Sequence, residues 1–269
     1  MPASSLIHVY LSPHLDDAVL SCGGMIHRQT QAGERVVVVT VCAGDPPPGP
    51  LSALAQTLHE RWQTPPGEAV AARRAEDLAA LSVLGAQAVH LDVLDCIYRT
   101  DPETGRHLYG AETSLFGNVH PSEPTLVRRI ATQISALLSG FGRRHFHVPL
   151  GLAHHVDHQV TRQAAEMAQG VYAYFEDYPY AAREVVAPTP LLAGTPATPG
   201  ATPPPGRVFS PELVLLSTTN LDAKVRAIAQ YVSQISTFWA DEAVMAADVR
   251  RFAERVGAGN PAERIWRTG

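Results

Sequence analysis

The sequence predicts an α/β protein built on a mostly parallel sheet with helices on both of its faces. Short β-rich runs alternate along the chain with longer runs whose apolar residues recur at helical spacing. The run RVVVVTVC at Arg35–Cys42 is rich in β-branched residues, as expected of a strand that is buried on both faces. The sequence contains no internal repeat that would indicate a solenoid. The predicted architecture is therefore Rossmann-like.

The elements are assigned in chain order from two patterns. Runs of β-branched and aromatic residues predict strands, and Ala, Leu and Val at three- and four-residue spacing predict helices. A glycine after a helical run predicts its end, as Gly33 and Gly85 do for the first two helices. The resulting order is strand Ile7–Leu11, helix Asp17–Gln31, strand Arg35–Cys42, helix 67–84, strand Ala88–Leu91, helix Thr125–Ser139, strand His145–Val148, helix 158–168, strands Val171–Phe175 and Glu212–Ser217, and helices 221–236 and 241–256.

We expect a single domain over residues 1–269, with its core at about 5–185 and 207–258. Residues 187–206 interrupt this core with seven prolines and no charged residue. Such a composition is typical of a flexible or extended excursion. This Pro-rich insert is a candidate subunit contact, so a homo-oligomer is one expectation.

Composition excludes several classes of protein. Apolar residues make up 45% of the chain and charged residues 17%, which fits a globular protein and not a disordered one. A net charge of −5 offers no basic excess to a phosphate backbone, so no nucleic-acid partner is expected. No apolar stretch reaches the roughly 18 residues of a membrane span, and the N-terminus lacks the features of a secretion signal. We expect a cytoplasmic protein with no membrane partner.

The three cysteines, Cys22, Cys42 and Cys96, are odd in number and widely spaced. This arrangement predicts neither a disulfide framework nor a cysteine-based zinc site, and it favours buried apolar roles.

A first polar cluster, Ser12-Pro13-His14-Leu15-Asp16-Asp17, directly follows the first strand. Two adjacent carboxylates beside a histidine are costly unless a cation compensates them. The alternative is helix capping, with one Asp at the N-terminal cap and the other stabilised by the helix dipole.

A second cluster, His154-His155-Val156-Asp157-His158, follows the strand His145–Val148 and a turn. A capped helix with surface histidines is again the alternative. His145 and His147 also lie nearby, but they share one face of a predicted strand and are interpreted as packing residues.

Together the clusters predict a metal centre, because both follow strands of one parallel sheet and ligands bind beyond the carboxyl ends of such strands. His14 and Asp17 are three residues apart, as are His155 and His158. Two imidazoles and one carboxylate match a catalytic zinc site with its fourth position left for water, whose pKa zinc lowers to near neutrality.

In this interpretation the other polar side chains of the clusters surround the metal. Asp16 is the uncoordinated carboxylate that can act as general base. His155 is the spare imidazole, which can hold an oxyanion or protonate a leaving group. Asp157 can orient one of the histidines.

PHLDD at 13–17 with HVDH at 155–158 resembles the signatures of the LmbE-like (PIG-L) deacetylase family. The resemblance extends over roughly residues 5–240. It includes an Arg-x-x-Glu motif at 73–76 within the helix 67–84, the strand and loop Leu91–Asp95, and segments at 174–179 and 224–234.

The resemblance implies an LmbE-like fold and zinc-dependent hydrolysis of an N-acetyl group from a small-molecule, N-acetylglucosamine-type sugar. Fe²⁺ or another divalent ion is the alternative metal. By position, His14, Asp17 and His158 match the metal ligands, and Asp16 matches the general base. His155 matches the histidine that stabilises the oxyanion or donates a proton, and Asp157 its supporting partner. Arg73 and Asp95 match residues that contact sugar hydroxyls.

The chain departs from the family pattern at three positions that are not expected ligands. Leu15 and Val156 replace prolines, and Ala18 replaces a glutamate that could have supported the metal.

Two other functions use some of the same features. A phosphoester hydrolase would more naturally hold two metals with further bridging Asp or His side chains, which the sequence does not supply at matching positions. A non-catalytic sugar-binding protein is disfavoured by the presence of both a base and an acid. A dinucleotide site is disfavoured because Cys22-Gly23-Gly24 lies inside a predicted helix.

Overall fold

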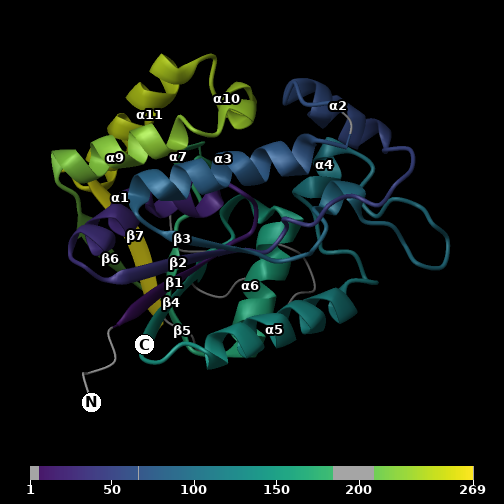
Figure 1. Cartoon of the computed structure of the whole chain (residues 1–269), viewed down its shortest axis with the longest axis horizontal. Helices are drawn as coiled ribbons and strands as arrows, with labels where there is room; N and C mark the ends of the chain where they lie inside the picture. Colours follow the sequence, from purple (N-terminus) through teal and green to yellow (C-terminus); the bar gives the residue numbers. More distant parts are fainter. Residues whose placement is uncertain (1–5, 66, 184–208, 269) are drawn as a thin grey trace.

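A computed structural model describes residues 6–65, 67–183 and 209–268. Seven strands form one sheet in the order β3-β2-β1-β4-β5-β7-β6 (Figure 1). The Pro-rich insert at 187–206, and with it the suggested subunit contact, lies outside the described residues.

The first five strands of the sheet run parallel. They are β1 (Ile7–Ser12), β2 (Arg35–Thr40), β3 (Gln87–His90), β4 (Arg144–Pro149) and β5 (Val171–Phe175). β7 (Ala262–Thr268) is antiparallel to β5, and β6 (Phe209–Leu215) is antiparallel to β7. The predicted fold class, a mostly parallel sheet covered by helices, is confirmed.

Helices cover the two faces of the sheet in separate layers (Figure 1). Because successive strand residues point to opposite faces, Tyr10 and Val38 pack under one layer, and Leu11 and Val39 under the other. The first layer contains α1 (Asp17–Gln31), α3 (Ala69–Leu84), α9 (Thr218–Ile228) and α11 (Glu242–Val256). The second contains α5 (Pro124–Ser139) and α6 (Val156–Ala168).

Shorter helices lie in the connections, and several border the carboxyl ends of the parallel strands. α2 packs against η1 and α10. In chain order these helices are α2 (Ala53–Arg61), η1 (Cys96–Tyr98), α4 (Glu112–Leu115), η2 (Leu152–His154), α7 (Tyr180–Arg183) and α10 (Val232–Phe238). None of the helices in the described ranges has the length and apolar character that a membrane span requires.

The structure differs from the sequence prediction in several elements, and one of them is the short helix α4, in a stretch predicted as loop. The helix predicted at 221–236 is two helices, α9 and α10, separated at 229–231. Residues 53–61 form α2 within a stretch predicted as loop. β7 was not predicted, and it lies inside the sheet between β5 and β6.

Candidate functional site

The turn from β1 into α1 is held by Ser12, whose hydroxyl donates to the carbonyl of His14 at 2.6 Å and accepts the Ala18 amide at 3.0 Å. Asp17 Oδ2 accepts the His14 amide at 2.8 Å. Asp16 occupies the N-terminal cap position of α1, but its carboxylate accepts no capping hydrogen bond. The capping alternative therefore does not account for Asp16, whose carboxylate is left for another role.

The segment from β4 into α6 delivers the second cluster. Gly151 turns the chain at φ 79°, a left-handed conformation that favours glycine, before η2 begins. His155 then caps α6, with its Nδ1 accepting the Asp157 amide at 3.3 Å. His158 follows one helical turn later and is fully buried. Since β1 and β4 are neighbours, the two clusters meet at one edge of the sheet.

Asp17 is the meeting point of the two clusters. Its Oδ2 lies 3.1 Å from His14 Nδ1 and 3.3 Å from His158 Nε2. The opposite nitrogen of each imidazole also contacts a carboxylate, because His14 Nε2 lies 3.0 Å from Asp157 Oδ2 and His158 Nδ1 lies 2.6 Å from Asp177 Oδ1. With the outer nitrogens held by these carboxylates, the inner nitrogens, His14 Nδ1 and His158 Nε2, are directed at Asp17.

These donors fit a divalent metal ion. Zinc bonds of about 2.0–2.1 Å in tetrahedral geometry place neighbouring ligand atoms about 3.3 Å apart, close to both separations from Asp17. His158 Nε2 is buried and has no hydrogen-bond partner among the described residues. Carboxylates that hold the outer nitrogens are the usual support for metal-binding histidines.

The pKa shifts show that this group of side chains favours a cation. Burial opposes a charge on His158, yet Asp17 and Asp177 raise its pKa to about 10. Burial likewise opposes a charge on His14, but Asp157 and Asp17 raise its pKa well above the usual value. Burial would raise the pKa of Asp17, but the two histidines hold it well below its usual range. The carboxylates that stabilise a positive charge on these imidazoles would in the same way stabilise a divalent ion between the donors.

Asp16 faces a cavity together with Arg73 and Asp95. The Arg73 guanidinium lies 3.8 Å from Asp16 and 4.0 Å from Asp95, and it stacks over Trp62. Burial and the neighbouring Asp17 raise the pKa of Asp16 to about 6. The cavity also contains His14, Asp17 and His155 and has an apolar wall of Leu58, Trp62, Ile97, Leu115, Phe116 and Phe238.

His155 lies at right angles to the ring of His14, with ring centroids 4.9 Å apart, and its other neighbours include Phe116. Burial, together with the neighbouring His14 and His158, holds the pKa of His155 well below its usual value. His155 is therefore neutral near pH 7. Because Nδ1 accepts the Asp157 amide, the proton of the neutral ring lies on Nε2.

The carboxylate of Asp157 supports His14, which corrects the expectation that it supports His155. Its Oδ2 accepts from His14 and from the Cys96 amide at 3.0 Å, and its Oδ1 accepts from Arg99. Only the backbone amide of Asp157 contacts His155. The physical reason is its position in the first turn of α6, from which the carboxylate reaches the turn between β1 and α1, and η1.

The sequence analysis assigned no role to Asp177 or Arg99. Asp177 Oδ2 accepts the amides of Gly151 and Leu152, so this carboxylate holds both the turn before α6 and His158. Arg99 pairs with Asp157 and Glu123 inside the protein. An acidic residue directly after a parallel strand was the available signal for Asp177. The three cysteines, all within the described ranges, are free and buried.

Comparisons with known proteins identify a family and similar chains. The sequence model of a family described as "PIG-L: GlcNAc-PI de-N-acetylase" matches residues 9–169. A 2'-N-acetylparomamine deacetylase from Niallia circulans is 29% identical over 187 residues, which cover 64% of this chain and 66% of that protein, just under two thirds of its length.

Solved structures are similar over almost the whole chain. Teicoplanin deacetylase Orf2 in a zinc-inhibited form is 30% identical, with a TM-score of 0.83 and 98% of each chain covered. The A40926 pseudoaglycone deacetylase Dbv21 is 28% identical, with a TM-score of 0.76, and the match covers 99% of this chain and 97% of that one.

Proposed function

This chain belongs to the PIG-L (LmbE-like) family, and from that premise we propose that it is a metal-dependent N-deacetylase. Its reaction is the hydrolysis of an N-acetyl group on an N-acetylglucosamine-type sugar or glycoconjugate. The relatives named as deacetylases of teicoplanin and of 2'-N-acetylparomamine support this reaction class.

One observation carries the proposal: the Asp17 carboxylate faces one nitrogen of each of two imidazoles, at 3.1 and 3.3 Å, and each imidazole is backed by a further carboxylate. His14, Asp17 and His158 would hold the metal. A divalent ion held there would supply two kinds of chemistry, a lowered pKa for water and polarisation of an acetyl carbonyl. Zinc suits the two-imidazole, one-carboxylate set, and Fe²⁺ is the alternative.

Asp16 is the general base in this proposal. Its carboxylate faces the cavity, and its pKa of about 6 is close to that of an efficient proton carrier at neutral pH. It takes the proton of the attacking water and returns it to the leaving amine. Neutral His155 donates from Nε2 to the oxyanion that forms on the acetyl carbonyl.

Arg73 and Asp95 would bind the sugar. Their side chains lie on the cavity wall beside Asp16, where hydroxyl groups can accept from the guanidinium and donate to the carboxylate. Trp62 and Phe116 provide apolar surface for the faces of sugar rings.

The test is acetate release from a panel of N-acetylglucosamine glycosides, with a generic phosphodiester as the competing substrate class. We expect Asp16→Asn to keep bound metal and to lose about 10²–10⁴-fold in kcat. We expect His158→Ala to lose the metal and the activity together. Asp248→Asn, an aspartate of α11 that pairs with Arg251, is the matched control and should retain both.

Near-normal turnover by Asp16→Asn would remove Asp16 as the base. Phosphodiester cleavage without acetate release would overturn the reaction class.

A further inference from the structure

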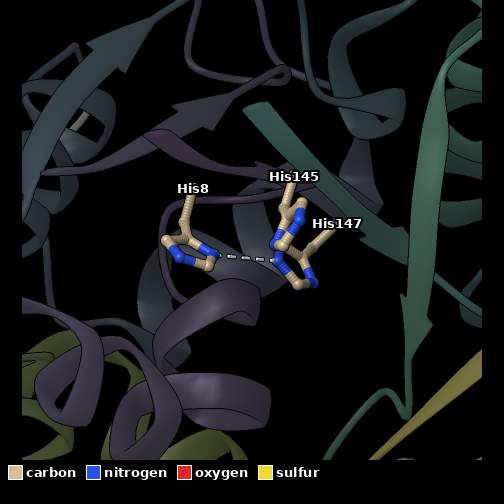
Figure 2. A group of neighbouring side chains, drawn as sticks. All are labelled: His8, His145 and His147. Carbon is tan, nitrogen blue, oxygen red and sulfur yellow. Dashed lines mark hydrogen bonds between the residues drawn. The ribbon is translucent and has the colours of Figure 1, made fainter. Parts of the chain in front are cut away.

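Three histidines gather at the amino ends of β1 and β4, the opposite end of these strands from the candidate site. His8 is the register partner of His145, and His147 lies two residues further along β4. Figure 2 shows His145 and His147 beside each other and facing His8. His8 and His147 are buried, and His145 is half-buried. The packing role expected for His145 and His147 did not include His8, which is far away in the sequence.

The geometry of this cluster suits a metal ion. One nitrogen of each ring lies within 4.8 Å of the others, and His8 Nδ1 is 3.4 Å from His147 Nε2, as the dashed line in Figure 2 marks. Tetrahedral zinc with bonds of about 2.0–2.1 Å requires a separation of about 3.3 Å. The ring of His145 stacks on Tyr172 at 3.6 Å between centroids, which holds it beside the other two.

Glu34 supports the cluster from outside. Its Oε2 lies 3.0 Å from His8 Nε2, so that the proton of His8 lies on Nε2 and the lone pair of Nδ1 is directed at His147. His147 Nδ1, at the end of this chain of contacts, is buried with no hydrogen-bond partner in the described ranges. The contact between His8 and His147 therefore leaves one nitrogen of the cluster without a partner in the described ranges.

The protonation state of the rings also suits a metal. Burial lowers the pKa of all three histidines, well below the usual value for His147, so they are neutral at pH 7 and can offer lone pairs. Arg267 and Arg143 add positive charge on this side, but Arg267 is paired with Glu212, and Glu34 adds a negative charge. A cavity lined by all three rings, with Met25, Gln29 and Tyr172, provides an entry path.

We propose that His8, His145 and His147 form a second metal site, for Zn²⁺ or another imidazole-binding ion such as Ni²⁺ or Cu²⁺, with Glu34 fixing the orientation of His8. Three neutral imidazoles with an open fourth position form an established zinc-binding set. The site is independent of the proposed deacetylase centre, and it would fasten β1 to β4 at their amino ends.

The test uses the full chain without an affinity tag, titrated with Zn²⁺ against a chromophoric chelator. In a His14→Ala/His158→Ala background, which removes the candidate catalytic ligands, we expect one remaining zinc equivalent. Adding His145→Gln should weaken that equivalent at least tenfold, and adding His8→Gln should do the same. His107→Gln, an exposed histidine elsewhere, should leave it unchanged. His145 is the leading variant because it is only half-buried, and circular dichroism checks that each variant folds.

Absence of zinc binding in the double-alanine background would overturn the second site. The second site would also be overturned if the background protein bound one zinc with an affinity that neither His145→Gln nor His8→Gln lowers. X-ray absorption of the zinc-loaded background variant should show imidazole nitrogen ligands, and their absence would also overturn it. If wild type binds one zinc that His145→Gln removes and His158→Ala does not, the second site stands and the deacetylase metal centre fails. The reverse pattern supports the deacetylase centre and overturns the second site.

Discussion

Asp177 shows how one side chain can set the chemistry of another. Its carboxylate accepts from His158 Nδ1 at 2.6 Å, and this contact leaves Nε2 as the nitrogen that faces Asp17. The histidines and aspartates of both clusters could be identified from the sequence. The carboxylate that contacts the outer nitrogen of each imidazole could not be identified, because that contact depends on how far β5 extends past β4 and on the direction of the first turn of α6.

Asp177→Asn should lower zinc affinity by about 10–100-fold, because an amide in place of the carboxylate holds the His158 imidazole less firmly and makes it a weaker ligand. Chelator competition measures the affinity. Glu176→Gln is the control, since the neighbouring Glu176 contacts Arg264 and Trp266 and not the site. Equal affinity in wild type and Asp177→Asn would show that Asp177 does not orient a metal ligand.

At the scale of elements, most of the parallel sheet could be predicted, as could the edge strand β6, for which Glu212–Ser217 was expected and Phe209–Leu215 is found, whereas β7 could not. Strand Val171–Phe175 and helix Asp17–Gln31 have the predicted bounds because their residue patterns are local. β7 (AERIWRT) carries charged residues on both of its faces. Its Glu263 is buried by a partner from another element, Lys224 on α9, and this pairing is invisible in a local pattern.

Glu263 joins three elements. Its carboxylate accepts from the amides of Gly24 and Met25 on α1 and from Lys224 Nζ at 2.7 Å. Gly24 also leaves room for Leu216, in the connection between β6 and α9, since a Cβ at Gly24 would lie 2.5 Å from a Leu216 methyl. The glycine pair that the sequence analysis placed inside a helix therefore serves packing.

Glu263→Gln should lower the free energy of unfolding by about 3–5 kcal/mol, because it leaves the Lys224 ammonium buried without a counter-ion. Urea unfolding followed by circular dichroism gives the value. Glu212→Gln on the adjacent β6 removes only an exposed pair with Arg267 and should cost less than about 1 kcal/mol. Similar losses of unfolding free energy in the two variants would mean that the buried pair contributes no more to stability than the exposed pair.

At the scale of the whole molecule, the candidate site lies where the strand order changes direction. From β1 the chain proceeds to β2 and β3 on one side, and then returns to β4 on the other. Loops after β1 and β4 diverge at such a point and leave a crevice between them. This placement was predictable, because it follows from parallel topology alone, whereas the apolar wall from α2 and α4 lay in segments predicted as loops.

A metal held across this crevice should stabilise the entire fold. Zinc at about 100 times its dissociation constant adds about 2.7 kcal/mol, which corresponds to a rise in Tm of roughly 5–10 °C for a chain of this size. Differential scanning calorimetry with and without chelator measures the shift. The part of the shift that belongs to the candidate site is the part that His14→Ala/His158→Ala removes. A chelator effect that is the same in both proteins would place the stabilising ion elsewhere.

The strand order also has a consequence for biosynthesis. His14 and Asp17 leave the ribosome before His158 and Asp177, which follow them by more than 140 residues of chain. Until β4 inserts beside β1, the nascent protein displays two carboxylates and an imidazole with no means of enclosing an ion. Truncated products that stop before β5 would therefore be inert, and a metal held by the candidate ligands would be enclosed only after α6 and β5 have been added to the fold.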